Sequence, residues 1–509
     1  MKEFFKELRR RKVYGVAVAY IVIGWLLLQV AATLFPIFHA PEWVLQIFSI
    51  ILFLGFPLAL LLAWAYDLTP GGIRRATDTE IESQEDPEET AGVLPESEAP
   101  SQEPVQDRSE APWVAVLPLK CQGGDAELEA FSDGLTEDIT TGLSRFSYLM
   151  VISTNSARKF EGQSMDVRQV GQQLGARYVI EGNVRKGGAT VRINIQLVDA
   201  LTGTSLWAET FDRKFEQAGM LDLQDQVSSR VVGTVADPNG VLVRSMIDLS
   251  KSDEPETLTP YEAVLRFFLY QQRISAEDHL PARLALERAV SLEPGYVDAW
   301  ACLALIYLDE DRHMFNPQPD ALDRALATAR KAVDIDTSSQ LAHFSLALVY
   351  FYRKDLGAFY SAADRAIAIN PLDAYSMAML GILYSYAGEW ERGIELTNKA
   401  MQLNPHHPGW YRFASFFHAY QQSRYEEALD IAQKIDMPDY FASRYALAAS
   451  HAQLGHVEAA REHAKEILRL YPDFETSLQH DHLDKWLYAQ DGLSEHIIEG
   501  LKKAGLNMA

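Results

Sequence analysis

The C-terminal half of the chain repeats a short pattern at a nearly constant interval. The segments ALERAVSLEP, ARKAVDIDT, ADRAIAINP, TNKAMQLNP and ILRLYP carry it, and its closing positions are Pro294, Thr337, Pro371, Pro405, Pro438 and Pro472. The spacings between these positions are 43, 34, 34, 33 and 34 residues. A unit of this length holds two helices and cannot bury its apolar face alone, so neighbouring copies must stack. The pattern predicts an all-α solenoid over residues 263–474, in which an insertion at 309–320 lengthens one turn.

The repeats resemble the tetratricopeptide family. The residues that carry the resemblance are Trp300, Leu303, Ala304, Tyr307, Met377, Leu380, Gly381 and Tyr384 on first helices, and Ala282, Ala289, Ala366, Ala400 and Ala460 on second helices. Small residues let paired helices approach closely, and a closing proline cannot continue the second helix. The resemblance implies six repeats over residues 263–474, followed by capping helices over 475–509. Thr337 and the irregular stretch 408–440 depart from the family pattern.

In a tetratricopeptide solenoid the first helices form the inner wall, and the resemblance implies a partner-binding groove there. Counting from the start of each repeat, the candidate groove residues are Phe267, Leu305, Phe344, Phe351, Tyr375, Arg412, Phe416 and Tyr445. An aromatic-rich groove of this kind suits an extended or helical peptide of a protein partner. The alternative is that several of these side chains pack between repeats instead.

Two uncharged runs near the N-terminus predict membrane-spanning helices. Residues 13–35 and 43–66 contain no charged side chain, and each run is long enough to cross a hydrocarbon core of about 30 Å. Lys and Arg residues precede the first run and follow the second, whereas the turn between them has none. This bias predicts that residues 1–75 form a two-helix hairpin in the bacterial inner membrane, with both ends in the cytoplasm. A signal peptide is the competing interpretation, which the length of the first run disfavours.

Residues 76–112 are predicted to form a disordered acidic linker. They contain twelve acids, one Arg and five Pro, with few bulky apolar residues. Such a segment cannot bury enough surface to offset its ordering entropy. An anionic inner leaflet would repel it, so the linker is expected to hold the following domains away from the membrane. The net charge of −24 on the whole chain argues against nucleic acid as a partner, because phosphate binding needs a basic face.

Residues 113–236 alternate between strand and helix patterns, which predicts an α/β (α+β) module, and residues 237–262 connect it to the repeats. The strand patterns lie at 113–119, 148–153 and 177–213, and the helix patterns lie around 135–143, 166–175 and 221–235. Hairpin turns are expected at Lys186-Gly187-Gly188 and at Thr202-Gly203. In the middle strand, one face would consist of Val191, Ile193, Ile195 and Leu197, which predicts a half-buried strand.

The module resembles the TolB-like (FlgO-like) domain family. The resemblance rests on the ordered blocks VAVLPL, FSDGLTEDITTGLSRF, YLMVIS, DVRQVGQQLGARYVIEGNVRK and VRINIQLVDALTGTSLWAETFDR. In bacteria such domains often precede tetratricopeptide repeats, and in many relatives they follow a class III nucleotide cyclase or a DNA-binding effector domain. Both are cytoplasmic, which agrees with the predicted topology. Nothing of that size lies between the predicted spans and residue 113, so the resemblance does not imply cyclase activity.

Residues 131–146 raise the question of catalysis, because three carboxylates lie within six positions. Asp133, Glu137 and Asp138 could supply acid–base or metal chemistry. Ser132 and Asp133 are also good helix N-cap types, and acids in the first turns suit the helix dipole. Since no His, Cys or Lys accompanies them at a telling spacing, helix capping is the preferred interpretation.

Other chemical motifs are missing from the sequence. It contains no phosphate-binding glycine loop, zinc-protease motif or nucleophile elbow. Cys121 and Cys302 are too far apart in sequence for a disulfide framework or a zinc ligand set, and no histidine pair has a helical metal spacing. The sequence therefore indicates no catalytic, cofactor-binding or metal-binding residues.

The leading hypothesis is a non-enzymatic scaffold or adaptor. The chain would be anchored in the bacterial inner membrane by its hairpin, carry a TolB-like module of sensory or coupling role, and recruit a protein partner through its repeats. Two alternatives stay open. One is a signalling enzyme or enzyme regulator related to the cyclase-linked TolB-like proteins, and the other is an envelope-assembly factor with residues 67–509 outside the cytoplasm.

Overall fold

A computed structural model shows that the chain divides into two units, residues 1–104 and 105–509. The structure describes residues 66–69, 72–75, 112–122, 125–163, 165–215, 219–250, 255, 257–477, 483–487, 489 and 492–508. The predicted spans 13–35 and 43–66 and the linker 76–112 therefore lie outside the described residues, apart from the end residues Tyr66 and Pro112. Within the described ranges, no helix combines the length and hydropathy that a membrane crossing requires.

The described part of the first unit is a short hairpin that sequence reasoning missed. Strands β1 (Tyr66–Thr69) and β2 (Gly72–Arg75) pair antiparallel, with Tyr66 opposite Arg75. Each strand has four residues, which is too short for an alternating pattern to stand out in the sequence.

The second unit begins with a six-stranded mixed sheet in the order β5-β3-β6-β7-β8, in which β4 also pairs with β6. The strands are β3 (Trp113–Val116), β4 (Lys120–Gln122), β5 (Met150–Val151), β6 (Ala176–Gly187), β7 (Thr190–Asp199) and β8 (Thr204–Lys214). Strand β3 lies parallel to β5 and β6, whereas β6, β7 and β8 are antiparallel. The strand predicted at 113–119 ends early, at Val116, ahead of Pro118, which has no N–H to donate to the ladder, and β4 begins beyond the predicted range.

The antiparallel part of the sheet confirms the sequence pattern. In β7 the side chains of Val191, Ile193, Ile195 and Leu197 are all buried. Gly188 and Gly203 occupy the two predicted turns with φ of 65° and 76°, a left-handed conformation that glycine adopts without steric cost. The alternation of buried and more exposed side chains along β7, together with the two turn glycines, therefore fixes the register of this strand.

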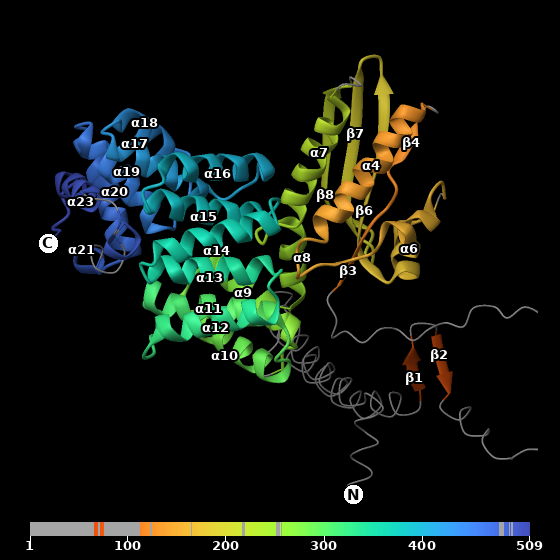
Figure 1. The fold of residues 1–509 in the computed structure, drawn as a ribbon, viewed down its shortest axis with the longest axis horizontal. Coiled ribbons are helices and arrows are strands. Elements are labelled where there is room, and N and C mark those ends of the chain that lie inside the picture. Colours follow the sequence, from red (N-terminus) through yellow and green to blue (C-terminus); the bar gives the residue numbers. More distant parts are fainter. Residues whose placement is uncertain are drawn as a thin grey trace, which may run out of the picture. The chain divides into compact units, whose positions relative to one another are not determined.

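Helices cover both faces of the sheet (Figure 1). They are α4 (Ala126–Leu143), α5 (Thr154–Ala157), η1 (Arg158–Phe160), α6 (Val167–Leu174), α7 (Met220–Val235) and α8 (Val241–Ser250). Helices α4 and α7 pack against each other over one face, and α6 packs on the other face beside Ala115 and Val179. Gly175 ends α6 with a φ of 67°, as its position after the helical pattern predicts.

The predicted start of α4 is wrong. The helix begins at Ala126, and its N-cap is Asp125, whose carboxylate accepts a hydrogen bond from the Glu127 N–H at 3.1 Å. Ser132 lies inside the helix, is buried, and donates its hydroxyl proton to the Leu119 carbonyl at 2.8 Å. The acidic residues ahead of Phe131 hid this extra length, because they weaken the apolar periodicity by which a helix is recognised.

The C-terminal part is a tetratricopeptide-like solenoid of six helix pairs among the described residues (Figure 1). The pairs are α9 (Pro260–Arg273) with α10 (Ala276–Leu292), α11 (Val297–Arg312) with α12 (Ala321–Ile335), α13 (Gln340–Tyr352) with α14 (Leu356–Ile369), α15 (Ala374–Tyr386) with α16 (Trp390–Leu403), η3 (Gly409–Arg412) and α17 (Phe413–Gln421) with α18 (Tyr425–Gln433), and α19 (Phe441–Gln453) with α20 (Val457–Leu470). They are followed by α21 (Phe474–Ser477), α22 (Asp484–Trp486) and α23 (Leu493–Lys503), of which α23 packs against α19. These elements confirm the multi-domain, sheet-plus-solenoid fold class.

The insertion in the second repeat is held by a buried carboxylate. The Glu310 side chain has no exposed surface and pairs with Arg283 at 3.0 Å and with Arg324. It also accepts a hydrogen bond from the Gln318 backbone N–H at 3.2 Å. Residues 313–320 are thereby pinned between α11 and α12, although Asn316 adopts a positive φ of 46°. The lengthened turn is an ordered part of the repeat.

Candidate functional site

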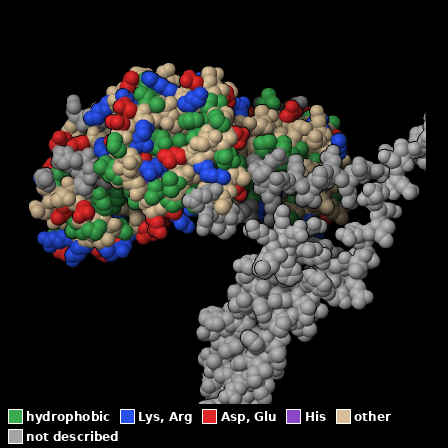
Figure 2. All heavy atoms as spheres, turned by 90° about the horizontal axis from the view of Figure 1, so that it is seen from below, with side chains coloured by type: hydrophobic (Ala, Val, Ile, Leu, Met, Phe, Trp, Pro, Cys, Tyr) green, Lys and Arg blue, Asp and Glu red, His purple; other side chains and the backbone are tan. Residues whose placement is uncertain are grey.

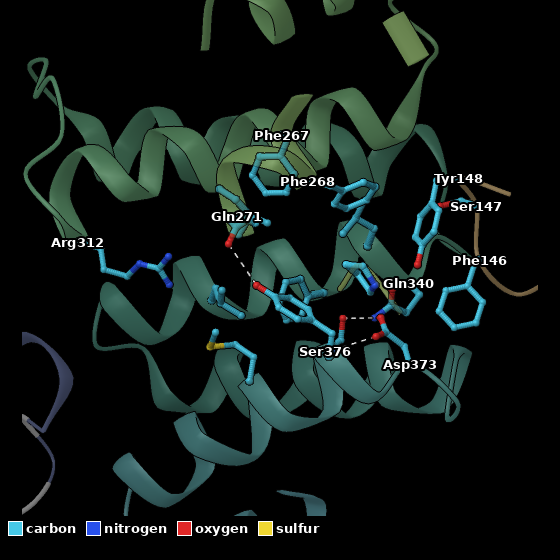
Figure 3. A pocket seen from close by; sticks show the side chains of 17 residues that line it. Phe146, Ser147, Tyr148, Phe267, Phe268, Gln271, Arg312, Gln340, Asp373 and Ser376 are labelled. Atoms are coloured by element: carbon cyan, nitrogen blue, oxygen red, sulfur yellow. Dashed lines mark hydrogen bonds between the residues drawn. The ribbon is translucent and has the colours of Figure 1, made fainter. Parts of the chain in front are cut away.

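The inner wall of the first four repeats closes on a small cavity (Figure 3). Side chains of α9, α11, α13 and α15 line it together with the loop that follows α4. Its volume is about 30 Å³, which is enough for one or two water molecules. The cavity is mainly apolar and aromatic, with Arg312 at the end away from the α4 loop. A cavity of this size has no room for a peptide.

Four of the eight predicted groove residues meet at this cavity. They are Phe267, Leu305, Phe344 and Tyr375. The first three are buried, and the Tyr375 hydroxyl donates a hydrogen bond to Gln271 Oε1 at 3.2 Å. This bond joins the fourth repeat to the first, so the inner helices touch each other across the solenoid. Whether these residues contact a partner stays a prediction.

The other four predicted groove residues do not line this cavity. Phe351 and Tyr445 pack between helices, with ring centroids 5.5 Å from Phe359 and 6.3 Å from Phe474, which is the alternative that the sequence left open. Phe416 is buried and contacts its neighbour Phe417 within α17. The Arg412 guanidinium donates to the Lys434 carbonyl at 3.3 Å. In the fifth repeat, η3 replaces the start of a regular first helix. Whether any of these four residues contacts a partner stays a prediction.

The α/β module seals one side of the cavity. Phe146, Ser147 and Tyr148 all line it from the loop after α4. The Tyr148 hydroxyl donates to the Ala236 carbonyl, and its ring packs edge-on against Phe268 with centroids 5.0 Å apart. Ser147 donates to Asp298 Oδ1 at 2.9 Å. Three consecutive residues of the module therefore form one side of a cavity that is otherwise lined mainly by the repeats.

A second contact joins α7 of the module to α16 of the repeats. Gly233 lies so close to α16 that a Cβ added there would stand 2.7 Å from the Leu403 carbonyl oxygen. Arg145 adds a polar link by donating to the Ile369 carbonyl at 3.2 Å. Because helix backbones approach this closely only where a side chain is missing, the module and the repeats pack as a close-fitting pair.

Asp237 lies buried at this junction, in the turn that follows α7. Its carboxylate accepts a hydrogen bond from the Asn239 N–H at 2.7 Å and from the Tyr411 hydroxyl at 3.4 Å. Burial raises its pKa from 3.8 to about 7, and the nearby Asp373 carboxylate adds to the rise. The hydrogen bonds from Asn239, Asn404 and Tyr411 oppose the shift without cancelling it.

Asp373 and Asp298 are two further buried carboxylates at the junction. Asp373 is the N-cap of α15 and accepts hydrogen bonds from the backbone N–H and the hydroxyl of Ser376, at 3.0 and 2.5 Å. Burial raises its pKa. Burial likewise raises the pKa of Asp298 to about 6, and the neighbouring Asp336 carboxylate contributes to the rise. The Ser147 hydroxyl opposes it.

Sequence reasoning did not single out these three aspartates. Asp298 and Asp373 stand in the first turn and at the cap of their helices, where aspartate is ordinary on any exposed helix. Asp237 stands in a turn sequence, DPNG, which is equally ordinary. These aspartates are buried because the module and the repeats meet there, and no local sequence pattern predicts that contact.

The three acids of the stretch 131–146 lie on the exposed and half-exposed side of α4. Asp133 is exposed and lies 4.0 Å from the Arg158 guanidinium, and Glu137 is also exposed. Burial and the Asp225 and Glu137 charges raise the pKa of the half-buried Asp138. In the part of the chain that the structure describes, no group of three or more His, Cys, Asp or Glu side chains could hold a metal ion. Cys121 and Cys302 are both free thiols.

The fold defines the class of protein: a sheet module packs on a tetratricopeptide-like solenoid, and the two enclose a small cavity. Residues 110–230 match the family described as HilA/YgeH-like transcriptional regulator, second domain. The match covers the sheet module and stops before α8, so it concerns less than half of the chain.

One curated relative is "Putative adenylate cyclase 3" of Rhizobium meliloti (strain 1021). It is 35% identical over 255 residues, which are 50% of this chain and 43% of the relative. The alignment thus spans less than half the length of the relative, and the relative's name describes a larger protein than the shared part.

Solved structures show distant likenesses. YrrB, described as a TPR protein with an unusual peptide-binding site, shares 17% identity over 42% of this chain and 98% of its own, with a TM-score of 0.27. The human IFIT1 dimer with m7Gppp-AAAA shares 15% identity over 56% of this chain and 69% of its own, with a TM-score of 0.37. Lipoprotein GNA1162 from Neisseria meningitidis shares 20% identity over 24% of this chain and 95% of its own, with a TM-score of 0.19. These likenesses are too distant to bear on function.

Proposed function

We propose that the chain is a membrane-anchored adaptor that recruits a protein partner through its helical repeats, and that the TolB-like α/β module controls access to them. The observation that carries this proposal is the sealed inner cavity. Residues that the sequence singled out for partner binding converge there, yet Phe146, Ser147 and Tyr148 of the module close it. The state described above is therefore the closed state of the adaptor, and a partner binds when the module lifts.

The described surface agrees with a protein partner. Figure 2 shows one face on which basic, acidic and hydrophobic side chains are interspersed, without a large patch of one sign. A nucleic-acid partner would need a large basic patch.

A hairpin anchor would confine the recruited partner to the membrane plane, which raises its effective concentration near other membrane components. A green fluorescent reporter fused after residue 75 should fluoresce, whereas phosphatase activity at that position would place residues 67–509 outside the cytoplasm.

Opening the module should increase partner capture. Ser147→Glu places a second carboxylate against the buried Asp298, and two carboxylates in a buried site repel each other. If the closed state limits binding, the amount of partner crosslinked in membranes should rise roughly tenfold, since apparent affinity follows the fraction of open molecules. The measurement is crosslinking, pull-down and quantitative mass spectrometry of the full-length chain.

The matched control is Ser205→Glu, which makes the same change of charge at an exposed position of β8. It should capture as much partner as the wild type. Equal capture by all three chains would show that the sealed cavity does not gate binding. Partners found with Ser147→Glu alone, and lost when Phe344→Ala is added to it, would place binding at the inner wall.

A second candidate is a signalling enzyme or a regulator of one, which the name of the relative from Rhizobium meliloti favours. Asp133 is the exposed acid that this candidate would use. Nucleotide turnover by the purified full-length chain, lost in Asp133→Ala, would support the enzyme. The adaptor proposal expects no turnover from either protein.

A further inference from the structure

The junction between module and repeats buries three carboxylates without a cation to balance them. Asp237 comes from the turn that directly follows the last helix of the module, α7, and Asp298 and Asp373 come from the repeats. Each is at most 5% exposed. Among the described residues none of the three forms an ion pair, and their partners are hydroxyl, amide and backbone N–H groups. A charged carboxylate without a cation is costly to bury, whereas a protonated one is not.

Three cations that border the junction are engaged elsewhere. Arg244 donates to the Gly240 carbonyl at 3.3 Å. Arg145 donates to the Ile369 carbonyl at 3.2 Å. Arg312, at the far end of the cavity, pairs with Asp309 at 2.7 Å. Ion pairing with these residues therefore does not relieve the buried carboxylates.

We propose that docking of the α/β module onto the repeats takes up protons at Asp237, Asp298 and Asp373, so that the junction loosens as the pH rises. The inference concerns the contact between the two parts and holds whether or not the repeats bind a partner. We call the three aspartates at this junction the proton-linked latch, because their protonation would hold the module and the repeats together.

The direction of the effect follows from the shifted pKa values. Burial raises the pKa of Asp237 from 3.8 to about 7 and that of Asp298 to about 6, and it also raises the pKa of Asp373. The docked state thus binds protons more tightly than the open state, in which these groups regain ordinary values. Docking is strongest below about pH 4 and weakens as the pH rises, up to about pH 6 for Asp298 and about pH 7 for Asp237.

The titratable groups that face the three aspartates directly do not change charge in this range. The groups that face Asp237 and Asp373 are Tyr148 of the α4 loop, Tyr375 of α15 and Tyr411 of η3, and those that face Asp298 are Tyr148, Tyr261, Tyr296, Cys302 and Asp336. Burial raises the pKa of each of these tyrosines and of Cys302, so they stay neutral. Hydrogen bonds from Ser338 lower the pKa of Asp336, so it stays charged. One step further away, His407 stacks on Tyr411 at a centroid distance of 5.2 Å, and burial lowers its pKa from 6.5, so it is neutral at the upper end of the range.

Hydrogen exchange of the full-length chain between pH 5 and pH 8 tests the latch, because it detects rare opening as well as complete release. The reporters are the amides of Phe146, Leu149 and Gly240, which are hydrogen-bonded within the loop and the turn at the junction. After correction for the intrinsic exchange rate, the opening constant should rise roughly fiftyfold between pH 5 and pH 7 from Asp237 alone. Amides of β7 report on the module itself and should not follow this rise.

Two variants separate the latch from a general effect of pH. Asp237→Asn keeps the acceptor for Asn239 and cannot ionise, so it should remove most of the rise above pH 6. Asp334→Asn, at an exposed position of α12, makes the same change of charge and should behave as the wild type. Asp298→Asn provides a second test if Asp237→Asn fails to fold, and should flatten the profile below pH 6. An opening constant that is independent of pH in the wild type would overturn the proposal, as would an unchanged slope in Asp237→Asn.

Discussion

Replacing Glu310 by Ala is expected to lower the free energy of unfolding of the repeats by about 3–5 kcal/mol. The carboxylate has no exposed surface and balances Arg283, whose side chain is 14% exposed, together with Arg324. Without it, the partly buried Arg324 loses its carboxylate partner, and Arg283 keeps only Glu287 at 3.8 Å. The Gln318 N–H, which orders the insertion, also loses its acceptor. Denaturant unfolding followed by far-ultraviolet circular dichroism measures the change.

The control for Glu310 is an ion pair of the same kind at the surface. Asp323 pairs with Arg353, but its side chain is 71% exposed. Because water screens such a pair, Asp323→Ala should leave the unfolding transition unchanged. A Glu310→Ala chain as stable as Asp323→Ala would mean that the insertion is not held by the buried carboxylate.

Replacing Tyr148 by Ala is expected to destabilise the docked chain by about 3–5 kcal/mol, because it removes a large buried ring and leaves a cavity. The ring packs between Phe146 and Phe268, at centroid distances of 5.7 and 5.0 Å. The loss falls on the contact between module and repeats, because the ring of Tyr148 in the α4 loop packs against Phe268 of α9. The single unfolding transition should therefore separate into two, one for each part, and exchange of the Gly240 amide should accelerate.

Tyr148→Phe provides the matched control. It keeps the ring and removes the hydroxyl that donates to the Ala236 carbonyl, which should cost about 1 kcal/mol. If Tyr148→Phe is as damaging as Tyr148→Ala, the hydrogen bond that holds the loop to Ala236 within the module is what matters, and the packing of the ring on the repeats is not. If neither variant changes the exchange of Gly240, the loop does not hold the module in place.

Features that depend on short-range periodicity could be predicted from the sequence. The buried face of Val191 to Leu197, the turn glycines and the six helix pairs all follow from alternation, backbone conformation and the 34-residue interval. The start of α4 could not be predicted, because Asp125 caps the helix ten residues ahead of the first residue of the predicted apolar face, Leu135, and the acids between them weaken the pattern.

The candidate site was predicted only in part, because it depends on how two domains meet. Phe267, Leu305, Phe344 and Tyr375 were found from their place on first helices, and the structure brings them together. The contacts that Tyr148 and Gln271 make at this cavity could not be predicted, since they join residues far apart in the sequence. Burial of Asp237, Asp298 and Asp373 has the same origin.

The central claim, that the module seals the inner side of the repeats, is tested most directly by a disulfide across the junction. Ser147 Oγ lies 2.9 Å from Asp298 Oδ1, so cysteines at these two positions are within bonding reach after small adjustments. In a Cys121→Ser, Cys302→Ala background, the full-length Ser147→Cys, Asp298→Cys chain should form the intramolecular bond on mild oxidation, seen as a linked peptide by mass spectrometry. The single-cysteine chains should show no such link. If both thiols of the double variant instead stay free and react with maleimide, the module does not rest on the repeats, and the sealed state is not the state of the protein in solution.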